Sequence, residues 1–404
     1  MKKISMSFIS LSFVLFLSVF PSFTLEYQAN ATTEDGMEYV NISDKNGNSK
    51  KFSRLIMGTD HLLQAEWKNE KQKEISDKEF NEFLDESVKL GINTFDSSPI
   101  YVGGVEYKFG KWLKSRNQKI HEDSFYYNKN LNPDKEVYTI SKGGFPFDLY
   151  NSKKLESGTH SKEILDLLTE NNILDKNLIS SKNESIQLHD NVPAGTYASV
   201  LYGNKEQITN RVSKELDNIL AHFDSLTVLL MHRDDFDFLG FNEIKREQTP
   251  VKTILEALGD SKIKNKYLMM GLSNWKTERV DKSLELGDKY QNLPKPVLNS
   301  PYFSLFEMST RSIHAGGVQV YHNEMMNDSF QKGIKIMPYS PLGGFSILDK
   351  SEPRWENAKK DAKNKYDKGD PYWQNVYNAI FTQDNEKRYY RVVEFTKKFN
   401  EKNK

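Results

Sequence analysis

The stretch that decides the fold is residues 91–101, GINTFDSSPIY. Its first half, from Ile92 to Asp96, predicts a short buried strand that ends on a carboxylate. A phenol, Tyr101, follows five residues after Asp96, within reach of the end of that strand. The stretch therefore predicts a strand with polar side chains gathered at its carboxyl end.

An alternation of helix and strand extends from this stretch in both directions. Before it, Ser76 and Glu79 have the spacing of a capping box, and apolar residues at helical spacing follow until Gly91 ends the helix. Strand followed by helix, repeated along a chain, predicts a parallel sheet covered by helices. We predict seven such strands, at residues 54–59, 92–96, 137–140, 226–231, 267–271, 296–299 and 334–337.

A closed α/β barrel explains this pattern better than an open doubly wound sheet. An open sheet usually carries a glycine-rich phosphate turn after its first strand. Here Gly58 to His61 lacks that pattern, and Gly103-Gly104 lacks the third glycine. We therefore predict a (β/α)8 TIM-type barrel with seven recognisable strands, preceded by a β-hairpin that turns at Asn46-Gly47.

Two polar stretches interrupt the predicted barrel domain, residues 37–404. Residues 145–204 follow the third strand and predict an insertion. Residues 347–371 are rich in charge and predict a long loop above the barrel mouth.

The amino terminus has the features of a secretory signal peptide. Lys2 and Lys3 precede an apolar run that ends at Phe20, and Ala29-Asn30-Ala31 is a small-x-small cleavage site. We expect residues 1–31 to direct export and to be removed, with an uncleaved membrane anchor as the alternative. We find no other long apolar segment, so we expect no stable membrane insertion after cleavage.

The composition excludes some functions. The 404 residues carry 56 basic and 56 acidic side chains. The formal net charge is therefore zero, which argues against electrostatic binding of nucleic acid. The chain has no Cys, which excludes disulfides, thiolate zinc sites and cysteine nucleophiles. The histidines are scattered, so we predict no metal site.

Four polar side chains are expected to meet at the barrel mouth. Asp96, Lys142 and His232 each follow an apolar run, and Tyr101 lies just beyond Asp96. Since the carboxyl ends of parallel strands share one face of a barrel, these residues converge. The ammonium is expected to lower the tyrosine pKa from ~10 towards neutrality. The phenol could then give or take a proton while the imidazole holds a substrate oxygen.

The chain resembles the aldo-keto reductase superfamily. The quoted stretch and the segments GGVE and GKWL that follow it match the family's pattern, which runs in order from about residue 37 to residue 345. The later matching segments are 141–144 (SKGG), 229–234 (LLMHRD), 271–275 (GLSNW), 300–305 (SPYFSL) and 338–344 (PYSPLGG).

This resemblance implies a reductase of a small carbonyl substrate. It makes Tyr101 the general acid, assisted by Lys142 and Asp96, while His232 orients the carbonyl and NADPH donates a hydride. It also implies that Ser273 and Asn274 hold the carboxamide of the cofactor and that Tyr339 stacks on the nicotinamide. The remaining implied cofactor contacts are Ser340, Leu342 and Gly344 along the pyrophosphate, and Gly58 and Thr59 near the ring.

The chain departs from the family pattern at two places. Ser300 stands where the family more often has Gln, which weakens one implied carboxamide contact. Residues 391–399 resemble the helix before the family's eighth strand, but we find neither that strand nor the basic motif for the adenosine phosphate. The chain is then either a truncated product, or residues 347–404 close the barrel in another way.

Two other functions are considered. A non-catalytic binding or accessory protein would keep the fold but bind cofactor weakly or not at all. A secreted barrel glycosidase would need two carboxylates facing each other across the mouth, and Asp96 is the one we find there. The sequence predicts neither the substrate nor the oligomeric state.

Overall fold

A computed structural model provides the fold of the chain. It describes residues 36–60, 62, 76–101, 104–120, 124–127, 135–148, 154–155, 179–182, 185–188, 197–235, 247–313, 317–326, 332–341, 354–369 and 371–402. The predicted signal peptide, residues 1–31, lies outside the described residues and stays a prediction. Among the described helices, none has the length and apolar character needed to span a membrane.

The predicted N-terminal hairpin is confirmed. Strands β1 (Tyr39–Ser43) and β2 (Ser49–Ser53) pair antiparallel. Gly47 in the turn has a φ of 89°, a left-handed conformation that glycine adopts without steric cost.

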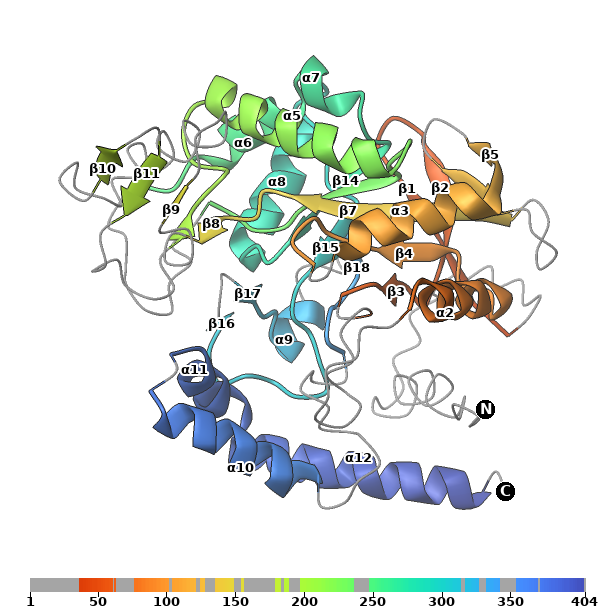
Figure 1. The fold of residues 1–404 in the computed structure, drawn as a ribbon, viewed down its shortest axis with the longest axis vertical. Helices are drawn as coiled ribbons and strands as arrows, with labels where there is room; N and C mark the ends of the chain where they lie inside the picture. The colour runs from red at the N-terminus through yellow and green to blue at the C-terminus, as the bar shows by residue number, and fades with distance from the viewer. Residues whose placement is uncertain are drawn as a thin grey trace.

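Seven parallel strands form the barrel sheet, in the order β18-β15-β14-β13-β7-β4-β3 (Figure 1). Each of the seven predicted strands is therefore present, and the α/β barrel architecture is confirmed. Their bounds are β3 Met57–Gly58, β4 Thr94–Asp96, β7 Lys135–Gly143, β13 Val228–Met231, β14 Met269–Ser273, β15 Leu298–Ser300 and β18 Lys335–Ile336. Strands β5 (Asn117–Ile120) and β6 (Phe125–Tyr127) add an antiparallel pair at the start of β7.

Helices cover the outside of this sheet. The helix before β4 has the predicted capping box, with reciprocal hydrogen bonds between Ser76 and Glu79. These helices are α2 Asp77–Lys89, α3 Val105–Arg116, α5 Lys205–His222, α6 Val251–Leu258, α7 Ser261–Lys264 and α8 Thr277–Lys289. The short helix α9 (His322–Glu324) follows β17 (Gly317–Val318) and lies between the sheet and the C-terminal helices (Figure 1).

Side chains alternate between the two faces of the barrel strands. On β13, Leu229 and Met231 pack outward in the cluster that joins the sheet to its helices. Val228 and Leu230 belong instead to the inner cluster, together with Phe52 from the hairpin. Because side chains alternate along a strand, every second residue faces the barrel interior. The hairpin thus contributes to the core inside the barrel.

Short strands occupy the described part of the predicted insertion, 145–204. They are β8 Phe147–Asp148, β9 Lys154–Leu155, β10 Ile179–Lys182, β11 Ser185–Leu188 and β12 Tyr197–Ala198. Most of the insertion lies outside the described residues. A further small pair, β16 (Ser312–Ile313) with β17 (Gly317–Val318), follows β15.

The prediction of a long loop over residues 347–371 is wrong for most of its length. Residues Arg354–Asp367 form helix α10, and α11 (Pro371–Ile380) and α12 (Gln383–Lys402) follow it. Only Trp355 and Ala362 of α10 are buried, two helical turns apart. So narrow an apolar stripe is hard to distinguish from a charged loop in the sequence.

The helices α10–α12 form a group apart from those around the sheet (Figure 1). They build a second core in which the ring of Trp355 contacts Phe306, Phe381 and Tyr389. Phe306 lies in the segment after β15, so this second core packs on the carboxyl side of the barrel.

The barrel sheet ends at β3 and β18. In the parts of the chain that the structure describes, no strand lies beyond either end of the sheet. The helix expected at residues 391–399 is present as part of α12.

A close contact between α3 and α5 generates a stability prediction. A Cβ on Gly110 of α3 would collide with the main-chain carbonyl of His222 at the end of α5. Alanine normally stabilises a helix interior by about 1 kcal/mol over glycine. We expect Gly110→Ala instead to lower the free energy of unfolding by about 1–3 kcal/mol, because the helices must move apart. Urea denaturation measures this, and an unchanged or higher stability would contradict the contact. Lys114→Ala, on the exposed face of the same helix, is the control.

Candidate active site

Strand alternation directs three of the predicted site residues into the barrel mouth. Asp96 ends β4, Lys142 lies near the end of β7, and His232 directly follows β13. In each strand the residue two positions earlier lies on the same face, and for Lys142 and His232 those residues belong to the inner core. Pairing of β7 with both neighbouring strands brings the three ends together.

The Lys142 ammonium is the centre of the site. Its Nζ lies 2.5 and 2.6 Å from the two carboxylate oxygens of Asp96, 2.9 Å from the Ser97 carbonyl and 2.7 Å from Tyr101 Oη. The residue is only 5% exposed. Burial lowers the pKa of Lys142, and the Asp96 carboxylate opposes that shift. All three protons of the ammonium therefore have acceptors in the site.

Tyr101 is held at this centre, but its pKa moves opposite to the prediction. Its hydroxyl donates to Asp96 Oδ2 at 3.1 Å and accepts from Lys142. Burial, followed by the negative charge of Asp96, raises the pKa of Tyr101 well above its usual value. The expected lowering of the Tyr101 pKa is wrong because burial disfavours a phenolate and Asp96 balances the charge of the ammonium. Tyr101 thus keeps its proton at neutral pH.

His232 is buried beside the tyrosine as a neutral imidazole. Its ring lies 6.4 Å from that of Tyr101, edge to face. Burial lowers the pKa of His232 well below its usual value, and the charges of Arg233 and Lys142 act in the same direction. The Ser98 hydroxyl is 3.3 Å from Nδ1. When that hydroxyl donates to Nδ1, the ring proton resides on Nε2, which can donate to a ligand.

The end of β3 supports Asp96 from the side. Thr59 is fully buried, and both its main-chain N–H and its hydroxyl donate to the Asp96 carbonyl at 2.9 Å. Gly58 is exposed, with open space where a side chain would begin. In the structure Thr59 therefore holds the main chain of Asp96, whereas the sequence resemblance implies only a contact with the cofactor.

A second polar cluster lies at the ends of β14 and β18. Asn274 donates to the His232 carbonyl and to Ser273 Oγ, and accepts from Tyr339 Oη at 2.6 Å. Ser273 in turn donates to the carbonyl of Ser300 at 2.8 Å. An amide, a hydroxyl and a half-buried aromatic ring thus gather next to His232. Such a set matches the carboxamide and the flat ring of a nicotinamide.

The other predicted cofactor residues are placed only in part. Ser340 is described, half-buried, with a φ of 50°. Leu342 and Gly344 lie outside the described residues. Their assignment to the pyrophosphate stays a prediction.

Sequence reasoning missed two carboxylates that flank Lys142 along β7. Glu106 on α3 is 5% exposed and accepts a hydrogen bond from Ser141 Oγ at 2.5 Å. Glu215 on α5 accepts one from the main-chain N–H of Gly144 at 2.6 Å. Burial raises the pKa of each to about 7. The signal in the sequence was weak, because a single acidic residue in a helix usually faces solvent.

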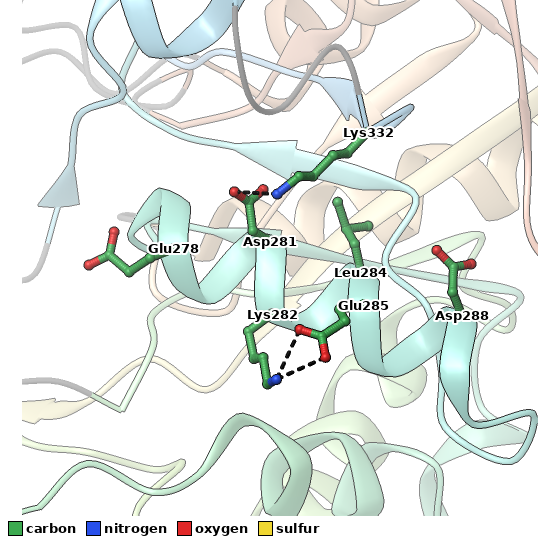
Figure 2. A pocket seen from close by; sticks show the side chains of 7 residues that line it. All are labelled: Glu278, Asp281, Lys282, Leu284, Glu285, Asp288 and Lys332. Atoms are coloured by element: carbon green, nitrogen blue, oxygen red, sulfur yellow. Dashed lines mark hydrogen bonds and ion pairs between the residues drawn. The ribbon is translucent and has the colours of Figure 1, made fainter.

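A hollow on the outer face of α8 lacks a buried group of acid and base side chains like that around Lys142. Figure 2 shows Lys332 reaching Asp281, at 2.7 Å, and Lys282 turned to Glu285, at 2.9 Å. Its carboxylates are thus largely paired with lysines. Within the described ranges, no group of three or more His, Asp or Glu side chains could hold a metal ion. The residues lining the hollow are Glu278, Asp281, Lys282, Leu284, Glu285, Asp288 and Lys332.

Comparison with models of known protein families gives a match that covers most of the chain. The model of the aldo/keto reductase family matches residues 54–146 and 147–402. A search of curated proteins finds no match to the chain.

The burial of Glu106 generates a pH prediction. Its pKa is raised from 4.5 to about 7 in the folded protein, so the stability it contributes is complete below pH 4.5 and is lost as pH rises through about 7. Between pH 4.5 and about pH 7, we expect the unfolding free energy of the wild type to fall by about 3 kcal/mol more than that of Glu106→Gln, because the amide does not titrate. Urea denaturation at several pH values measures the effect. Glu278→Gln, at an exposed position, is the control, and an equal slope in Glu106→Gln and wild type would contradict the prediction.

Proposed function

The chain belongs to the aldo/keto reductase family, and on that premise we propose that it reduces an aldehyde or ketone to an alcohol with NADPH. Membership of the family places it among oxidoreductases that use NAD(P)H on carbonyl groups. The choice of NADPH and of a small carbonyl substrate is part of the proposal.

One observation carries the proposal: the phenol, the ammonium and the carboxylate are in direct mutual contact. Lys142 Nζ lies within 2.7 Å of both Asp96 and Tyr101, and Tyr101 also donates to Asp96. A proton donor held against a buried cation is suited to protonating an oxygen that gains negative charge.

In the proposed reaction, Tyr101 delivers the proton. The nicotinamide, when bound, supplies the hydride to the carbonyl carbon. The Tyr101 hydroxyl turns its proton from Asp96 to the carbonyl oxygen, a rotation about one C–O bond. Lys142 continues to donate to the phenolic oxygen and stabilises the phenolate that forms. Asp96 keeps the ammonium charged and in place, because an isolated ammonium at this depth would lose its proton more readily.

His232 sets the position of the carbonyl. A neutral imidazole with its proton on Nε2 donates a hydrogen bond without competing as an acid for the transferred proton. The main-chain N–H of His232 donates to the Gly143 carbonyl at 2.7 Å, which anchors the histidine to the residue after Lys142.

The cofactor would be held by the cluster beside His232. Ser273 and Asn274 supply hydrogen-bonding groups for the carboxamide, and Tyr339 supplies a ring for stacking. Ser340 continues from Tyr339 towards the pyrophosphate, and Gly58 leaves open space at the end of β3.

A non-catalytic accessory protein is the second candidate. The observation that favours it is that the side chain of Asn274 already makes four hydrogen bonds within the protein. A protein of this kind would keep the site residues without binding NADPH.

Removal of the phenolic hydroxyl tests the catalytic proposal. We expect Tyr101→Phe to lower NADPH-dependent reduction of small aldehydes by roughly 100-fold or more, since it removes the general acid. Loss of NADPH absorbance measures turnover, and isothermal titration calorimetry measures cofactor binding, which should be unchanged. Wild-type protein that neither binds NADPH nor turns over any aldehyde would contradict the proposal and favour the accessory role.

We also propose that residues 1–31 direct export, on the strength of their sequence. The mature protein should then begin at Thr32. Mass spectrometry of the intact protein from its native host measures this, and a chain that retains Met1 would contradict cleavage.

A further inference from the structure

The side chain of Asn274 has no hydrogen-bonding capacity left. It is 1% exposed, and its main chain adopts a left-handed φ of 60° at the end of β14. Nδ2 donates to the His232 carbonyl at 3.2 Å and to Ser273 Oγ at 2.9 Å. Oδ1 accepts from the Val318 main-chain N–H at 3.0 Å and from Tyr339 Oη at 2.6 Å. An amide side chain makes two donor and two acceptor bonds, so all four are used.

The orientation of this amide follows from its partners. The Val318 N–H can only donate, so it faces the amide oxygen. The His232 carbonyl can only accept, so it faces the amide nitrogen. A flipped amide would oppose donor to donor and acceptor to acceptor.

Of the four partners, the Tyr339 hydroxyl is the one that can turn away without moving the main chain or breaking a second hydrogen bond. Val318 and His232 contribute main-chain groups held by their strands and loops, and Ser273 Oγ is itself bonded to the Ser300 carbonyl. Tyr339 is half-buried, and its hydroxyl is at the end of a side chain that can rotate. Burial raises the pKa of Tyr339 above its usual value, so the hydroxyl stays a donor at all physiological pH values.

We propose that the Tyr339 hydroxyl occupies, in the cofactor-free protein, the acceptor position on Asn274 Oδ1 that the carboxamide N–H of a nicotinamide takes. Binding then exchanges one hydrogen bond for another, and Tyr339 must turn away from Asn274. This inference rests on the proposed function, because it needs a nicotinamide cofactor.

The exchange predicts that the native hydroxyl weakens cofactor binding. Tyr339→Phe retains the ring but frees Oδ1, so NADPH should bind about 2- to 10-fold more tightly, the range for one net hydrogen bond. A cofactor analogue with an acetyl group in place of the carboxamide has no N–H to donate, and its affinity should not rise. If Tyr339 only positions the cofactor, the variant would bind NADPH equally or more weakly, and this overturns the inference.

Matched variants separate this effect from a change in packing. Tyr302 is a neighbouring tyrosine, with ring centroids 5.8 Å from Tyr339, but its hydroxyl donates to the Phe306 carbonyl. Tyr302→Phe should leave the ratio of NADPH to analogue affinity unchanged. Tyr339→Leu also frees Oδ1, so that ratio should rise in it even if the loss of the ring weakens both ligands.

Calorimetric titration of the full chain with NADPH and with the acetyl analogue provides the measurement, with thermal unfolding as the check that each variant is folded. Wild-type protein that binds NADPH, together with an unchanged affinity ratio in both Tyr339 variants, overturns this inference alone. Absence of NADPH binding by wild type and by every variant overturns both this inference and the proposed function.

Discussion

The pair formed by Lys142 and Asp96 is the interaction on which the site depends. A buried ammonium is stable only when its charge is balanced and its protons have acceptors. Asp96 supplies the charge, and the Ser97 carbonyl and Tyr101 complete the set of acceptors. This requires β4 and β7 to be adjacent and in register, which their pairing provides. Thr59 then fixes the main chain of Asp96 from β3.

The same buried charge organises its surroundings. His232 is held neutral by burial and by nearby positive charge. Tyr101 keeps its proton because burial raises its pKa and the negative charge of Asp96 raises it further. The site is therefore arranged around one ion pair with neutral donors beside it. Such an arrangement keeps the hydrogen-bond and proton donors protonated near neutral pH, as the protonation of a carbonyl oxygen requires.

Much of the fold followed from local pattern, and some of it did not. The seven strands, the hairpin and the capping box of α2 are short-range features, and each was predicted. Helix α10 was missed because its burial comes from Trp355 packing against Phe306 and Tyr389, which are far away in the chain. The raised pKa of Tyr101 was missed for a similar reason, since desolvation depends on everything that covers a group, not on its neighbours in sequence.

By itself, the sequence determined the strand order along the chain and the residue types at the strand ends, because hydrophobic periodicity and strand alternation are local properties. It thereby placed Asp96, Lys142 and His232 at one mouth. Only the tertiary structure decided the protonation of these groups, the carboxylates of Glu106 and Glu215 beside β7, and the contact of Tyr339 with Asn274. Those depend on burial and on distances between segments far apart in the chain, which no local pattern encodes.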